Sequence, residues 1–350
     1  NVVSFGQWPE AAQVATGLLA RAGRWDEALE MAQEWRRRAP AQVMLVDLAI
    51  AEIEINQRRL SAAQKVLEPY LAQASGDEPN GLLVNLRARI LIGQGDSGGA
   101  LAIFEPLLSR GAPWRAMCMA VAAQHLRDAA NARQWLEAVA AKIPADAVDE
   151  KVALAEQWFA VHRTLGDPPS REAALAVLNE LAGRTPPVAR ALEVRAIVAG
   201  EDGRKGDAEA DYRRALELDA NLPLSQNNLA MLLMEREADR AEALRLAQAA
   251  VAARPEIAGF RDTLAQVLVR SGDANGALIS LRHATQLDPG NVQWKVATAE
   301  VLLRMGRRAE AAQTVKEIES QGLGDGGVPA SVRRRLEDVK KALQVASTTP

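Results

Sequence analysis

Apolar residues along the chain recur at helical spacing in pairs of short segments. In the stretch that begins at Ile257, the residues Leu264, Val267 and Leu268 fall on one face of a helix. A polar turn follows, and a second segment around Leu281 has the same periodicity until Pro289, which cannot continue a helix. The pattern predicts two amphipathic helices joined by a turn.

The turn between these two helices recurs along the sequence. Gly95 opens "GDSGGA", and "GRWDEA", "GRKGDA", "GDANGA" and "GRRAEA" have the same form, ending in Ala five residues after the glycine. Copies without the glycine open at Gln57 and Arg127, and two more copies carry insertions. The nine anchoring alanines are Ala28, Ala62, Ala100, Ala132, Ala174, Ala208, Ala243, Ala277 and Ala311. Their spacings run from 32 to 42 residues and four are 34 residues, which indicates stacked helix pairs with one continuous core.

These repeats resemble the tetratricopeptide repeat family. The resemblance rests on a small residue in the first helix, Gly at the turn, Ala early in the second helix and a closing Pro, and it covers about 317 residues. It implies an all-α, right-handed α-solenoid of about nine helix-turn-helix repeats with a C-terminal capping helix. A lead-in would occupy residues 1–8, and the cap would occupy residues 329–346. The implied repeats are 9–42, 43–80, 81–112, 113–150, 151–188, 189–222, 223–257, 258–291 and 292–325.

Composition favours the all-α class and narrows the choice of partners. Aromatic residues make up only 4% of the chain, and strong helix formers dominate it. The 42 basic and 45 acidic residues nearly cancel, so we expect no nucleic-acid partner. No run reaches the ~18 apolar residues of a membrane span, so we expect no direct membrane insertion. The first residues lack an initiator Met and the features of a signal peptide, which predicts a removed leader or an excised segment and leaves a cytoplasmic or periplasmic location open.

Two short matches to catalytic motifs are better explained as a turn. "GDSGGA" looks like the nucleophile loop of a chymotrypsin-type protease, but such an enzyme needs a His ahead of that Ser, and His125, His162 and His283 all follow Ser97. "GQGDSG" fits the dinucleotide fingerprint, which needs a preceding strand that the pattern does not predict. No histidine pair has the spacing of a helical metal site, and Cys118 lies in an apolar run. We therefore predict no catalytic residue, no metal site and no cofactor.

The resemblance implies that a protein or peptide ligand binds the concave face lined by the first helices. A Lys/Asn/Arg clamp for a C-terminal carboxylate and an asparagine ladder are both disfavoured, because no consecutive repeats supply either set. What remains is a mixed polar groove with a methionine patch. The groove positions carried over from the family are Asp47, Glu54, Asn85, Arg89, Met117, Val121, Gln124, Arg190, Glu193, Asn227, Asn228, Met231, Met234, Asp262, Gln266 and Glu300.

The sequence therefore predicts a non-catalytic scaffold for protein–protein interaction. The Arg- and Ala-rich, loosely spaced repeats favour a bacterial array protein of an envelope or export assembly. Two alternatives stay open: a substrate-recruiting segment of a larger enzyme whose catalytic domain lies elsewhere, and a structural spacer that self-associates.

Overall fold

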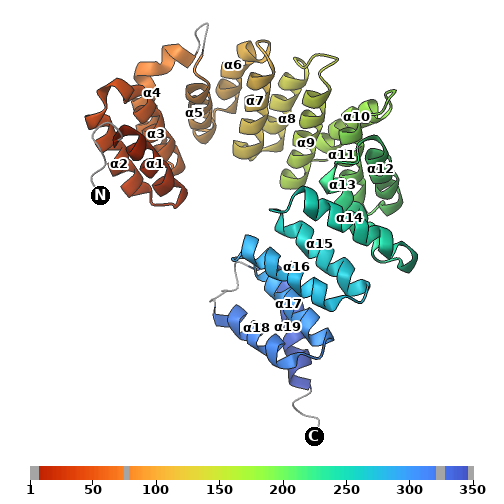
Figure 1. Cartoon of the computed structure of the whole chain (residues 1–350). Coiled ribbons are helices and arrows are strands. Elements are labelled where there is room, and N and C mark those ends of the chain that lie inside the picture. The colour runs from red at the N-terminus through yellow and green to blue at the C-terminus, as the bar shows by residue number, and fades with distance from the viewer. Residues whose placement is uncertain (1–7, 75–78, 321–327, 346–350) are drawn as a thin grey trace. The chain divides into compact units, whose positions relative to one another are not determined.

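The chain is all-α. In the computed structural model, which describes residues 8–74, 79–320 and 328–345, the secondary structure is helical and no strand occurs in this range (Figure 1). Contacts divide the chain into two compact units, Asn1–Leu178 and Asn179–Pro350. Of the predicted lead-in, residues 1–7 lie outside the described range. None of the described helices is both long enough and apolar enough to cross a lipid bilayer.

The helices of the first unit follow one another in pairs. The pairs are α1 (Trp8–Arg21) with α2 (Trp25–Arg38), α3 (Val43–Asn56) with α4 (Leu60–Leu67), α5 (Gly81–Gly93) with α6 (Ser97–Leu108), α7 (Ala112–His125) with α8 (Ala129–Ala140), and α9 (Val148–Leu165) with α10 (Pro168–Ala182), and the unit boundary falls within α10. Two 3-10 helices, η2 (Pro40–Gln42) and η3 (Glu68–Ala74), follow α2 and α4. The second helices α2, α4, α6 and α8 also pack against the first helix of the next pair, which makes the apolar core continuous through the unit.

The second unit repeats this arrangement and ends in a single helix. Its pairs are α11 (Ala189–Glu201) with α12 (Lys205–Leu218), α13 (Pro223–Leu233) with α14 (Arg240–Ala253), α15 (Ala258–Arg270) with α16 (Ala274–Leu287), and α17 (Val292–Arg304) with α18 (Arg308–Ser320); η4 (Glu237–Asp239) precedes α14. The last helix is α19 (Ala330–Val345). The described residues thus contain nine helix pairs and one terminal helix, which is the architecture of an α-solenoid.

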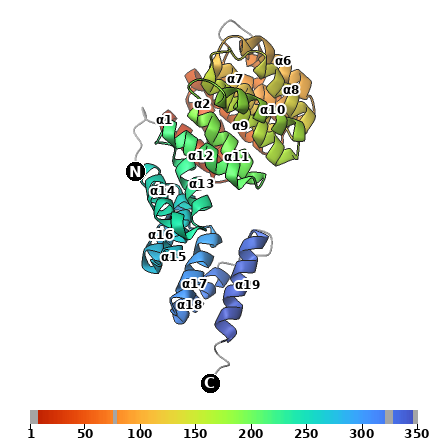
Figure 2. The same ribbon diagram turned by 90° about the vertical axis from the view of Figure 1, so that its right-hand side faces the viewer.

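The terminal helix α19 covers the apolar face of the last pair. It lies beside α17 and α18 in Figure 2 and contacts both. Val332 and Val339 are buried, Val332 against Val296 and Val339 against Val315, whereas Arg334 and Lys341 are exposed. With this division of residues, α19 buries the apolar surface of α17 and α18 and presents a charged face of its own, as a capping helix does.

Six of the turns within the pairs share one backbone geometry. A residue with positive φ ends the first helix, and the next N–H donates to the carbonyl five residues back, as Asp96 N donates to Leu91 O at 2.9 Å. Glycine supplies the positive φ in five of these turns, because it has no Cβ to clash in the left-handed region. In the turn between α3 and α4 the same place is taken by Arg58, with φ of 61°.

The geometry of this turn corrects the second anchor. The sequence predicts Ala62 as the anchoring alanine, but Ala62 is exposed, whereas Ala63 is fully buried like Ala28 and Ala100. The prediction is wrong because Arg58 does not look like a turn residue in the sequence. With Arg58 in the place of the glycine, the buried alanine falls five residues later, as it does in the other turns.

The protease-like stretch is one of these turns. Gly95 has φ of 89°, and the Asp96 side chain caps α6 by accepting a hydrogen bond of 2.8 Å from Gly99 N. Ser97 is the first residue of the helix, and its carbonyl accepts a hydrogen bond of 3.2 Å from Trp135 Nε1. The interpretation of "GDSGGA" as a turn and helix cap is confirmed.

Candidate functional site

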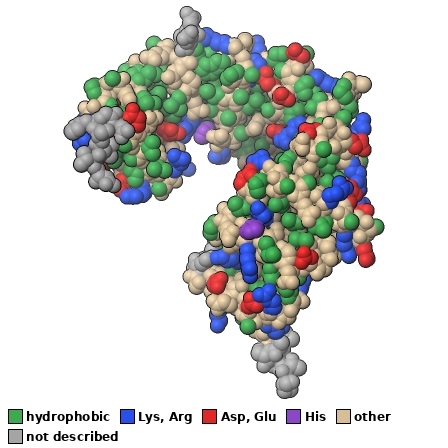
Figure 3. All heavy atoms as spheres, in the orientation of Figure 1, with side chains coloured by type: hydrophobic (Ala, Val, Ile, Leu, Met, Phe, Trp, Pro, Cys, Tyr) green, Lys and Arg blue, Asp and Glu red, His purple; other side chains and the backbone are tan. Residues whose placement is uncertain are grey.

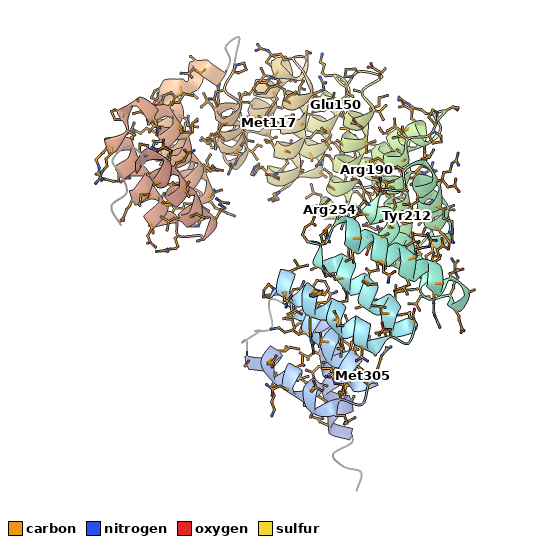
Figure 4. The ribbon with its side chains drawn as sticks, in the orientation of Figure 1. Met117, Glu150, Arg190, Tyr212, Arg254 and Met305 are labelled. Carbon is orange, nitrogen blue, oxygen red and sulfur yellow. The ribbon has the colours of Figure 1, made fainter. Side chains whose placement is uncertain are left out.

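In the first unit the predicted groove residues differ in accessibility. Asn85 on α5 and Met117 on α7 are half-buried, Gln124 is exposed and Val121 is buried. Met117, marked in Figure 4, lies over the start of α5, where a Cβ added to Gly81 would be 3.1 Å from the Met117 Cε atom. These side chains belong to neighbouring first helices, so Asn85 and Met117 could contact a common ligand.

Asp47 is not accessible, contrary to the prediction that it lines the groove. It is 1% exposed, and its carboxylate accepts a hydrogen bond of 2.7 Å from the Tyr70 hydroxyl and pairs with Arg36 at 2.8 Å. Glu54, also predicted for the groove, is buried and paired with Arg59. Asp47 lies fifteen residues before Ala62; counted from the correct anchor Ala63, that position is Leu48, which is also buried.

On α3, the residues that contact the predicted groove residue Arg89 are Glu52 and Asn56, and the sequence analysis predicted neither of them. Arg89 on α5 donates to Asn56 Oδ1 at 3.0 Å and lies 3.4 Å from Glu52 Oε1. Glu52 precedes the buried Ala63 by eleven residues, as Arg89 precedes Ala100. Counting from the correct alanine would therefore have found Glu52 directly.

His125, at the end of α7, has a strongly perturbed pKa. Partial burial, together with the positive charges of Arg89 and Arg127, lowers the pKa of the imidazole to about 4. His125 is consequently neutral at physiological pH. It could accept or donate a hydrogen bond there, but it cannot supply a positive charge.

In the second unit, Glu193 stabilises the helix stack itself. Its side chain is fully buried, and one carboxylate oxygen accepts hydrogen bonds of 2.9 Å from both the backbone N–H and the hydroxyl of Ser225, in the first turn of α13. Arg190, labelled in Figure 4, pairs with the carboxylate from the same helix. Glu193 thus caps the neighbouring repeat from α11, and the structure does not leave it available to a ligand as predicted.

The first turns of α13 carry the predicted asparagine pair. Asn227 is 7% exposed; its Nδ2 donates to Asn228 Oδ1 at 3.1 Å, while its buried Oδ1 has no hydrogen-bond partner. Asn228 in turn donates to the hydroxyl of the buried Tyr212 at 3.1 Å, so it joins α13 to α12. Met231, one turn after Asn227, is 43% exposed, whereas Met234 is buried.

The next two first helices carry charged and amide side chains. Asp262 on α15 is 8% exposed, and its carboxylate accepts a hydrogen bond of 2.9 Å from Gln266 Nε2. Burial raises the pKa of Asp262, partly opposed by the hydrogen bond from Gln266 and by Arg335. Glu300 on α17 is held by Arg335 of α19 in a two-point ion pair at 2.8 and 2.7 Å. A hollow of about 240 Å³ lies among α15, α17 and α19 and is lined in part by these groups.

Asn227, Met231, Asp262 and Gln266 together form what we call the α13–α15 face. It combines a buried unpaired acceptor, an exposed thioether, a buried carboxylate and an amide. Within the described residues, no group of three His, Cys, Asp or Glu side chains could hold a metal ion. Burial raises the pKa of Cys118 to about 12, so the thiol is protonated. Acidic and basic side chains are interspersed over the visible surface of each unit (Figure 3).

Helix pairs joined by a left-handed turn and stacked through small buried residues define a helical-repeat protein. A family model described as tetratricopeptide repeat matches residues 268–326, which span the end of α15 through α18. Residues 268–326 are thus similar to the tetratricopeptide repeat family. Proteins of this class are generally scaffolds for protein–protein interaction.

Several solved structures are similar to parts of the chain. A MamA fragment from Desulfovibrio magneticus RS-1 is 18% identical, covering 52% of this chain and 98% of that one with a TM-score of 0.44. A thermophilic tetratricopeptide repeat protein of Thermus thermophilus is 20% identical, covering 55% and 99% with a TM-score of 0.42. The O-GlcNAc transferase of Thermobaculum terrenum is 27% identical over 33% of this chain and 22% of that one, with a TM-score of 0.31. No curated protein matches the sequence.

Proposed function

We propose that the protein is a non-catalytic scaffold that binds an extended peptide or a partner helix on the α13–α15 face. The observation that carries the proposal is the pair formed by Asn227 and Met231. A buried acceptor without a partner costs about 1–3 kcal/mol, which a ligand N–H would recover. The exposed Met231 next to it offers an adaptable apolar surface.

The rest of this face fits a peptide ligand. The amide group of Gln266 lies beside the Asp262 carboxylate. Both residues are on α15, the first helix of the pair that follows α13 and α14. A peptide that donates a backbone N–H to Asn227 and places an apolar side chain on Met231 would reach them next. Main-chain hydrogen bonds would supply affinity, and the contact with Met231 would supply selectivity.

The test is selection of a random peptide library on the purified chain, followed by titration of the enriched peptides. Met231→Glu introduces a charge where an apolar side chain would bind, and we expect affinity to fall about ten-fold or more. Asn227→Ala removes the acceptor, and we expect a loss of roughly two- to twelve-fold, the range of one hydrogen bond. Ile279→Glu is the matched control, because Ile279 is 55% exposed on the second helix α16.

Circular dichroism first establishes that the three variants are as helical as the parent. Peptides that bind the parent and the Ile279 variant equally, but bind the Met231 variant weakly, would support the proposal. Enriched peptides that bind all four proteins with one affinity would contradict it, as would a library that yields no binder.

A further inference from the structure

A second candidate site lies in the first unit, apart from the α13–α15 face. A hollow of about 610 Å³ opens between the first helices α1 and α3, with part of α2 and the start of α5 in its wall. This volume lies in the ~300–1,000 Å³ range of small-molecule sites. The lining residues include Thr16, Gly17, Trp25, Leu45, Glu52 and Leu82.

The hollow is bordered by a glycine on α1, at a position where the following first helices have long side chains. Gly17 precedes the buried Ala28 by eleven residues, the place held by Glu52 on α3 and Arg89 on α5. A Cβ added to Gly17 would meet no atom within 4 Å. The hollow therefore includes the space that a side chain at this position would occupy.

The walls of the hollow are mainly apolar and partly aromatic. Leu45 and Leu82 are 40% and 43% exposed, and Trp25 is half-buried. The Trp35 indole adds to the wall, while its N–H is already donated to Gln42 at 2.8 Å. Indole edges and faces bind another ring better than an aliphatic chain of similar area.

One polar group in the hollow has no hydrogen-bond partner among the described residues. Thr16 is 4% exposed, and its Oγ1 makes no hydrogen bond. A hydroxyl can donate or accept, so it would pair with a phenol or an indole N–H alike. The remaining polar lining includes Asn56, whose Oδ1 already accepts from Arg89.

We propose that this hollow binds an aromatic group that carries one hydrogen-bonding substituent, such as the phenol or indole of a peptide side chain or of a small molecule. The ring would pack among Leu45, Leu82 and Trp25, and its polar substituent would pair with the Thr16 hydroxyl. The inference concerns a different unit from the α13–α15 face and does not rest on the function proposed for that face.

The experiment is a methyl NMR titration of the full chain with p-cresol and with toluene, which differ by one hydroxyl. We expect p-cresol to shift the methyl signals of Leu45 and Leu82 saturably and to leave Leu287, equally exposed on α16, unchanged. Thr16→Val removes the hydroxyl at nearly constant shape. It should weaken p-cresol by roughly two- to twelve-fold and leave toluene unaffected.

Gly17→Leu places a branched side chain in the space where the ring would lie and should abolish binding of both compounds, while unperturbed distant methyl signals verify the fold. N-acetyl-tyrosinamide distinguishes the sources of the ring: its binding assigns the hollow to a peptide side chain, and its exclusion while p-cresol binds assigns it to a free aromatic molecule. The proposal is overturned if p-cresol gives no saturable shift, if binding survives Gly17→Leu, or if p-cresol and toluene bind equally well.

Discussion

The hollow of the first unit and the α13–α15 face of the second are built from corresponding positions of the repeat. Gly17 lies eleven residues before the buried Ala28, and Gln266 lies eleven residues before the buried Ala277. Gly17 has no side chain and borders the hollow of about 610 Å³ between α1 and α3. Gln266 instead turns onto Asp262, and the hollow beside that pair holds about 240 Å³.

This difference separates what the fold fixes from what it leaves free. The alanines where two helices cross are fully buried in both units, so stacking prescribes them. Positions that face away from the crossing vary in their side chain and include glycine, arginine, methionine and glutamine, although the backbone is helical at each of them. Binding chemistry can therefore change from an apolar hollow to a polar face without disturbing the stack.

The largest expected effect concerns the stability of the Glu193 variant. It tests whether Glu193 stabilises the fold of the second unit or is a binding residue. Glu193→Ala removes the acceptor of two Ser225 hydrogen bonds and leaves Arg190 without its buried partner. We expect a loss of about 3 kcal/mol in the free energy of unfolding, measured by urea denaturation followed by circular dichroism.

Glu217→Ala is the control for Glu193, since Glu217 forms an exposed ion pair with Arg214 and should change stability by less than about 0.5 kcal/mol. If both variants unfold at the parent's urea concentration, Glu193 is not the internal cap that its hydrogen bonds indicate.

The next effect is confined to acid and concerns the first unit. His125 has a folded-state pKa of about 4, below its ordinary value near 6.5, so the unfolded chain binds a proton before the folded chain does. Stability should therefore fall as pH drops from 6.5 toward 4. His125→Gln should reduce this loss by about 1 kcal/mol, a figure lowered for the partial exposure of the ring.

Thermal unfolding of the parent and the His125 variant at pH 7 and pH 4.5 isolates the contribution of His125 to the loss of stability in acid, because the carboxylates titrate alike in both proteins. A parallel decline of the two melting temperatures between these pH values would contradict the assignment of the acid sensitivity to His125.

A smaller gain is expected at the irregular turn of the second repeat. Arg58→Gly places the residue found in the five equivalent turns at a φ of 61°. The left-handed conformation costs an L-residue about 1–2 kcal/mol, part of which is offset by the greater freedom of glycine in the unfolded chain. We expect a net gain of about 0.5–1 kcal/mol in urea denaturation, and Gly95→Ala should lose a similar amount. A loss of stability in the Arg58 variant would mean that its side chain has a role of its own.

The same turn explains where sequence reasoning succeeded and where it failed. Periodic apolar residues and recurring turns were enough to predict an all-α solenoid of helix pairs, because each pair repeats the same local signals. Arg58 hides one turn, so the sequence analysis placed the anchor at Ala62 instead of Ala63 and did not find Glu52, which lies eleven residues before Ala63. Sequence position alone could not reveal that Glu193 is engaged by Ser225, because that contact spans two repeats.

The smallest effect tests the hollow without filling it. Gly17→Ala adds a methyl group where nothing lies within 4 Å, and alanine favours a helix interior over glycine by about 0.5–1 kcal/mol. Hydrogen exchange of the α1 amides should show a stabilisation of about 0.5 kcal/mol, with p-cresol binding largely retained. Gly99→Ala should have the opposite sign, because its Cβ would lie 2.2 Å from Asp96 Oδ2 and displace the cap of α6. Destabilisation of α1 by Gly17→Ala would show that the hollow is narrower than 610 Å³ implies, and would remove the space that an aromatic ring requires.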